Sequence, residues 1–120
     1  GVLETASVYQ FGLQGYSVGG SFTENRTTGD TYCLLGNYTN DNTNGYAYIY
    51  NANNSSKYTY VTSQSMDDDQ DASPDSIGLF GGSMLPQAST VDGIQLFGGS
   101  SGSNIAGTFK LYGVKQIWVT

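Results

Sequence analysis

Short apolar runs closed by glycine recur three times in the second half of the chain, and each run predicts a β-strand. Successive side chains of a strand face opposite sides of a sheet, and glycine gives the backbone the freedom to turn away from it. The runs are Ile77–Ser83, Ile94–Ser100 and Phe109–Gly113, the last continuing as Val114–Val119. Their spacings of 17 and 15 residues are too irregular for a solenoid, so we interpret them as separate strands of one domain.

Apolar and polar stretches alternate in the first half of the chain as well. Strands are expected at Ala6–Phe11, Thr31–Tyr38, Tyr46–Tyr50 and Lys57–Ser63, with a short apolar segment at Tyr16–Val18. Turns or polar loops are expected at Gly15–Gly20, Ser21–Asp30, Thr39–Gly45, Asn51–Ser56 and Met66–Pro74, and Asn44-Gly45 is a typical hairpin turn. About eight antiparallel strands of this length usually pack as two sheets. The sequence therefore predicts an all-β chain, a jelly-roll-like antiparallel β-sandwich that forms a single domain over residues 1–120.

Tyrosines follow a strict alternation along two of these expected strands. If the two strands pair as a hairpin across Asn51–Ser56, five tyrosines stand together on one surface of the sheet. We call this set the tyrosine stripe: Tyr46, Tyr48, Tyr50, Tyr58 and Tyr60.

Three interpretations of the tyrosine stripe stay open at this point. It can be core or a sheet edge packed under a loop, or it can be a subunit interface, in which tyrosine is enriched. It can also be a platform on which rings stack against the apolar faces of sugars, with Asn53 and Asn54 of the neighbouring loop supplying polar contacts.

Charge and composition exclude several classes of function. The chain has 4 Lys and Arg against 10 Asp and Glu, a net charge of −6, whereas nucleic acid is bound through clustered cations. No run of about 18 apolar residues is present, so we expect no membrane insertion. The chain has no histidine, which excludes a Ser-His-Asp or Cys-His site, and Cys33 is interpreted as a small buried hydrophobe. A pair of carboxylates, as in glycosidases, stays arithmetically possible, but most of the ten acidic residues lie in expected loops, where solvation explains them. We therefore expect no enzymatic activity.

An acidic segment is the one candidate for a metal site. Asp67, Asp69 and Asp71 have the alternate spacing that places carboxylate oxygens around Ca²⁺. Ala72 stands where a calcium loop of the EF-hand type requires glycine, and Gly78 stands where it requires glutamate. A solvated acidic loop and a calcium site are the two interpretations, and no other cofactor is expected.

Two segments resemble a known group of proteins. Gly93–Lys115, in which a Ser/Gly/Asn loop leads into G-T-F-K-L-Y-G-V-K, is similar to the C-terminal signature of many bacteriophage virion proteins, and Tyr46–Gln64 resembles their central hairpin. The resemblance implies a jelly-roll-like domain in a tail fibre, tail spike or head fibre, commonly a homotrimer and often at the end that meets the host. It also implies that Gly107, Leu111, Tyr112 and Gly113 form the strand and turn that close the sandwich.

Three functional hypotheses follow from these observations. The first is a fibre or tail tip module on the surface of the extracellular virion, which binds a host glycan or protein through the tyrosine stripe, Asn53 and Asn54. The second is a structural capsid or tail decoration or trimerisation module, and the third is a carbohydrate-binding module of a secreted enzyme. The expected partners are further copies of the chain and other virion proteins. Because the chain opens with Gly1 rather than Met, we expect a fragment, a processed chain or a chain with a cloning remnant. In the virion setting it is expected to be a fragment or a small virion subunit.

Overall fold

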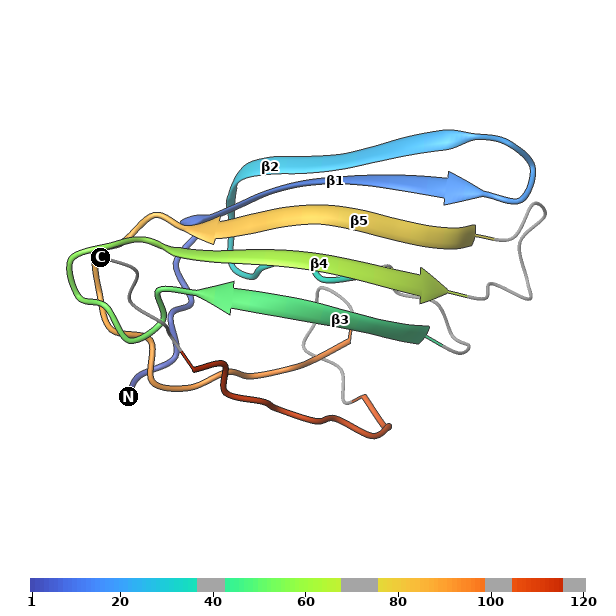
Figure 1. The fold of residues 1–120 in the computed structure, drawn as a ribbon. Helices are drawn as coiled ribbons and strands as arrows, with labels where there is room; N and C mark the ends of the chain where they lie inside the picture. The colour runs from blue at the N-terminus through green and yellow to red at the C-terminus, as the bar shows by residue number, and fades with distance from the viewer. Residues whose placement is uncertain (37–42, 68–75, 99–104, 116–120) are drawn as a thin grey trace, which may run out of the picture.

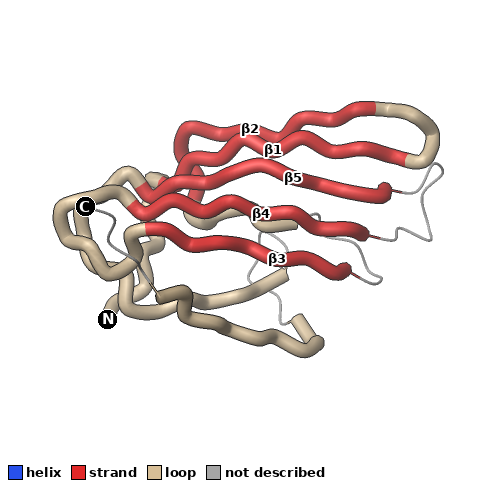
Figure 2. Tube along the Cα trace, viewed as in Figure 1, coloured by secondary structure: helices blue, strands red, loops and turns tan. Residues whose placement is uncertain are grey.

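Five antiparallel strands form one sheet in the part of the chain that the structure describes. The structure, a computed structural model, describes residues 1–36, 43–67, 76–98 and 105–115. The strands lie side by side in the order β2-β1-β5-β4-β3 (Figure 1). Figure 2 shows only strands and loops among the described residues. The strands are β1 (Tyr9–Ser17), β2 (Phe22–Asp30), β3 (Thr43–Tyr50), β4 (Thr59–Asp67) and β5 (Ser76–Leu85).

The two faces of this sheet differ because side chains alternate along each strand. In β4 the pattern is complete, since every second residue from Thr59 to Asp67 is buried and the residues between are exposed. We call the buried side the inner face and the opposite side the outer face. The buried apolar side chains of the inner face come from the three central strands: Phe11, Leu13, Val61, Leu79 and Leu85.

Irregular segments cover the inner face. Phe11, Leu13 and Leu79 form its core cluster, and Tyr32 and Leu34, which follow β2, pack against them. The ring of Tyr32 also meets Phe97 edge to face at 5.9 Å, so the segment after β5 joins the same layer. In Figure 1 the segments after β5 (orange to red) run below the sheet. The second layer of the described chain therefore consists of loops.

The expectation of an all-β antiparallel chain is confirmed, but several expected strands are wrong. Residues 31–36, 94–97 and 109–115 are not strands, and residues 37–38, 99–100 and 116–119 of the same expected strands lie outside the described residues. The segment after β2 crosses beneath the sheet, where Ser83 Oγ donates a hydrogen bond of 3.2 Å to the carbonyl of Leu34. Packing beneath the sheet thus replaces strand pairing for these apolar residues.

The polar segment expected to be a loop is instead the edge strand β2. Phe22 to Asp30 pairs with β1, with Asn25 opposite Leu13. Every residue of β2 is exposed or half-buried, so the strand needs no apolar side chains, and pairing with β1 decides its conformation. Asn44 and Gly45 are also strand residues, in β3, and not the expected hairpin turn. The expected strands at Tyr46–Tyr50 and Ile77–Ser83 and the loop at Asn51–Ser56 are confirmed.

Three groups near the inner face titrate above their usual range. Burial raises the pKa of the Cys33 thiol above 9.0, and burial also raises the pKa of the Tyr9 and Tyr32 hydroxyls above 10.0. A raised pKa means that the folded state favours the neutral form of the group. The contribution of that group to the free energy of unfolding is fully present below its unfolded-state pKa and is lost as pH rises through its folded-state pKa. We expect the free energy of unfolding in urea to fall between about pH 8 and pH 11. A constant or rising value over that interval would contradict the burial of these groups.

Candidate functional site on the outer face of the sheet

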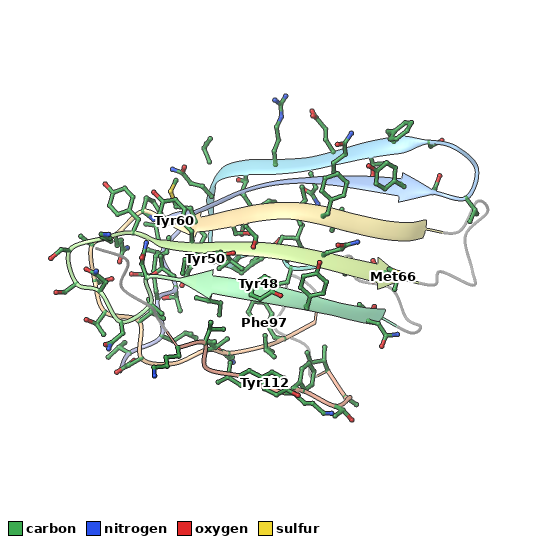
Figure 3. The ribbon with its side chains drawn as sticks, viewed as in Figure 1. Tyr48, Tyr50, Tyr60, Met66, Phe97 and Tyr112 are labelled. Carbon is green, nitrogen blue, oxygen red and sulfur yellow. The ribbon has the colours of Figure 1, made fainter. Side chains whose placement is uncertain are left out.

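The tyrosine stripe lies on the outer face of β3 and β4. Tyr46, Tyr48 and Tyr50 occupy alternate positions of β3, and Tyr60 of β4 is the register partner of Tyr50. This confirms the expected hairpin across residues 51–56. All five tyrosines are between 44% and 58% exposed, so the interpretation of the stripe as core is wrong. Figure 3 shows Tyr48, Tyr50 and Tyr60 on these two neighbouring strands.

Hydrogen bonds and ring contacts fix the orientation of the β3 tyrosines. The Tyr46 hydroxyl donates to Gln64 Oε1 at 2.9 Å, and the Tyr50 hydroxyl lies 3.5 Å from Thr62 Oγ1. The rings of Tyr46 and Tyr48 meet edge to face, with centroids 5.6 Å apart. The side chains therefore lean from the edge strand β3 over β4, and an exposed aromatic surface is held in place before any ligand arrives.

The remaining candidates lie at the turn that joins β3 to β4. Tyr58 precedes β4, and its carbonyl accepts a hydrogen bond from Asn51 Nδ2. Asn54 Oδ1 accepts from the Ser56 backbone N–H at 2.9 Å, so this oxygen serves the turn itself, whereas Asn53 is exposed. Of the two predicted asparagines, Asn53 is thus the one whose side chain is more available to a ligand.

A second aromatic cluster on the outer face was missed by the sequence analysis. Tyr16 of β1 stacks on Phe80 of β5 at 5.5 Å, and Phe22 of β2 meets Tyr16 edge to face at 5.2 Å. All three side chains are exposed. Tyr16 was expected in a turn and Phe22 in a loop, and only the strand register brings them together. Gly12, Gln14 and Tyr16 occupy alternate positions, so a strand that continues from Phe11 to Tyr16 places all three on the same face. This alternation was the signal available in the sequence.

A shallow trough crosses the middle of the outer face. It has a volume of about 410 Å³ and is open to solvent. Gly12 and Gly82, opposite each other in β1 and β5, lie at its centre. Its other outward-facing lining side chains are Gln10, Tyr60, Thr62 and Met84.

The predicted acidic site is only partly within the described chain. Asp67 is the last residue of β4, and its side chain is buried on the inner face. Asp69 and Asp71 lie outside the described residues. Within the described ranges no group of three or more His, Cys, Asp or Glu side chains gathers to hold a metal ion. Calcium binding stays a prediction, as does the absence of enzymatic activity.

Comparisons with known proteins identify no relative of this chain. No family model matches it, and neither the curated proteins nor the solved structures contain a match. Across the described ranges, the structure has no helix long and apolar enough to span a bilayer. The resemblance of Gly93–Lys115 to phage virion proteins stays an expectation drawn from those residues alone. The structure places Leu111 and Tyr112 of that segment outside the sheet, where both are exposed.

Proposed function

We propose that this chain is a non-enzymatic module on the surface of a phage virion, which attaches the particle to a glycan or protein of the host surface. The observation that carries the proposal is the exposed, ordered row of Tyr46, Tyr48 and Tyr50 on the outer face. Large exposed aromatic patches on a folded domain usually mark a contact with another molecule. The resemblance of Gly93–Lys115 supplies the virion setting.

The chemistry of the outer face suits a glycan in particular. Tyrosine offers an apolar ring that packs against the C–H face of a sugar and a hydroxyl that hydrogen-bonds to it. The amide of Gln64 and the hydroxyl of Thr62 stand directly beside the tyrosines. Such a surface binds without any catalytic group.

A second candidate function, a structural or trimerising module, is favoured by one specific observation. The segments after β5 carry apolar side chains that the described chain leaves exposed: Ile94, Leu96, Phe109, Leu111 and Val114. We propose that these segments gain strand partners when copies of the chain assemble as a homotrimer or join other virion proteins. Assembly would then complete the second sheet of the jelly-roll-like sandwich.

Replacing Tyr48 with alanine separates these two functions. We expect the wild-type chain to bind members of a glycan array, and Tyr48→Ala to lose that signal while its mass in solution stays that of the wild-type oligomer. Tyr112→Ala is the matched control for the glycan signal alone, because Tyr112 is exposed and lies outside the sheet, in a segment proposed to take part in assembly. Its glycan signal is expected to remain.

The opposite pattern would support the structural function. If the wild-type chain gives no glycan signal and Tyr48→Ala dissociates the oligomer, the tyrosine stripe is a subunit interface and the attachment proposal is wrong. The third hypothesis, a carbohydrate-binding module of a secreted enzyme, predicts the same glycan result. It differs in requiring a catalytic domain in the parent protein.

A further inference from the structure

The trough on the outer face follows one row of residues that runs across all five strands. Backbone register places these residues opposite one another in neighbouring strands, and their side chains point to the same side of the sheet. From β2 to β3 the row is Arg26, Gly12, Gly82, Thr62 and Tyr48. The two central positions have no side chain, which lowers the surface between taller neighbours.

The fold does not require glycine at position 12. A Cβ atom at Gly81, in the same pair of strands, would overlap the Gly12 carbonyl oxygen and lie 2.7 Å from Leu13 Cα, so packing explains that glycine. A Cβ at Gly12 would meet no atom within 4 Å, and the backbone there is not in the left-handed region. Glycine inside a strand weakens it and often marks a bulge, a tight bend or a place where a ligand or another backbone approaches closely, and β1 shows no bulge at Gly12.

Taller side chains form the two sides of the trough. Gln10, Met84 and Tyr60 line one side. On the other side the next row across the sheet contains Gln14, Phe80 and Gln64 as register partners. The lining of the trough thus offers the Tyr60 ring, the Met84 thioether, the Thr62 hydroxyl and the Gln10 amide, and two further amides, Gln14 and Gln64, lie in the neighbouring row.

We infer that this trough binds a neutral oligosaccharide chain lying across the strands. No lining side chain is charged, Arg26 at the β2 end of the row pairs with Glu24 at 3.5 Å, and the protein carries a net charge of −6, so an acidic ligand is disfavoured. An extended peptide binds through free backbone groups at a sheet edge, whereas those of β1, β5 and β4 are paired with neighbouring strands. A sugar chain instead needs ring faces, amides and hydroxyls, which the trough provides.

This inference rests on the proposed attachment function, and Gly12→Thr tests it separately. Threonine fits an extended strand, and its Cβ has free space, so the fold is expected to persist while the side chain fills the trough. On an array of neutral, sialylated and sulfated oligosaccharides, we expect the wild type to bind neutral members and Gly12→Thr to lose at least about tenfold in affinity. Gly93→Thr is the matched control, because a Cβ there also meets no atom within 4 Å and Gly93 lies outside the sheet.

Thr62→Val distinguishes a loss of binding from a folding defect in Gly12→Thr. Thr62→Val keeps the shape and strand preference of the side chain but removes its hydroxyl from the trough, so neutral-glycan binding should weaken while circular dichroism stays unchanged. Wild-type affinity in both variants, or binding confined to sialylated and sulfated members, overturns the inference and leaves the attachment function standing. An array on which the wild type binds nothing overturns the inference and the glycan form of the attachment function, and leaves attachment to a host protein.

Discussion

Gly81→Ala is expected to destabilise the domain by about 3 kcal/mol, because a Cβ there overlaps backbone and not a movable side chain. The atoms in its way are the carbonyl oxygen of Gly12 and Cα of Leu13, both fixed in the pairing between β1 and β5. The two strands cannot separate locally without breaking the centre of the sheet. Since small domains are stable by only about 5–15 kcal/mol, this loss is a large part of the total, and urea titration followed by circular dichroism measures it as a lower midpoint of unfolding.

Gly12→Ala is the matched control for this substitution. Gly12 lies in the facing strand, but its Cβ would enter open space above the outer face. We expect the control to change the free energy of unfolding by no more than about 1 kcal/mol, and toward higher stability. Equal stability of the two alanine variants would show that β1 and β5 do not have the register described above.

Leu13→Ala is expected to cost about 2–5 kcal/mol, the second large effect. Leu13 is 4% exposed and belongs to the core cluster with Phe11 and Leu79. Removal of its side chain leaves a cavity between the sheet and the loops that cover its inner face, and the paired β1 backbone limits how far the site can collapse. Thermal unfolding and urea titration of the variant measure the loss.

Leu111→Ala makes the same chemical change at an exposed position. Leu111 is 84% exposed and lies outside the sheet, so within one chain we expect a change within about 0.5 kcal/mol. If Leu111 contributes to an assembly interface as proposed, its loss appears as a weaker oligomer at low protein concentration. If Leu13→Ala and Leu111→Ala lose the same free energy of unfolding within one chain, Leu13 is not part of the core.

Alternation along the chain predicted the β3–β4 hairpin and its tyrosine stripe correctly. Tyr46, Tyr48 and Tyr50 are separated by residues of the other face, and a polar turn follows directly. Both signals are local, so no information about distant residues was needed. The exposure of the stripe could not be read from the same pattern, because a tyrosine row suits a core and a surface equally well.

Local signals failed where distant contacts decide the conformation. β2 has the polar composition of a loop, and only pairing with β1 makes it a strand. Conversely, Leu34 belongs to an apolar run that resembles a strand, yet it packs beneath the sheet against the core cluster. The second aromatic cluster, around Tyr16 and Phe80, was missed for the same reason, since it exists only once the register of β1 and β5 is known.

The two edges of the sheet differ in a way that limits aggregation. β2 is one edge strand of the sheet, and it carries Glu24 and Arg26 near its middle. Charged residues on an edge strand oppose the addition of a further strand. β3, the other edge, contains no charged residue from Thr43 to Tyr50. If β3 of one copy pairs with β3 of a second copy, the two copies are related by a twofold axis. The combined sheet then ends in β2 on both sides. Growth by strand addition would stop there, so a fibril is disfavoured and a threefold assembly must use another surface.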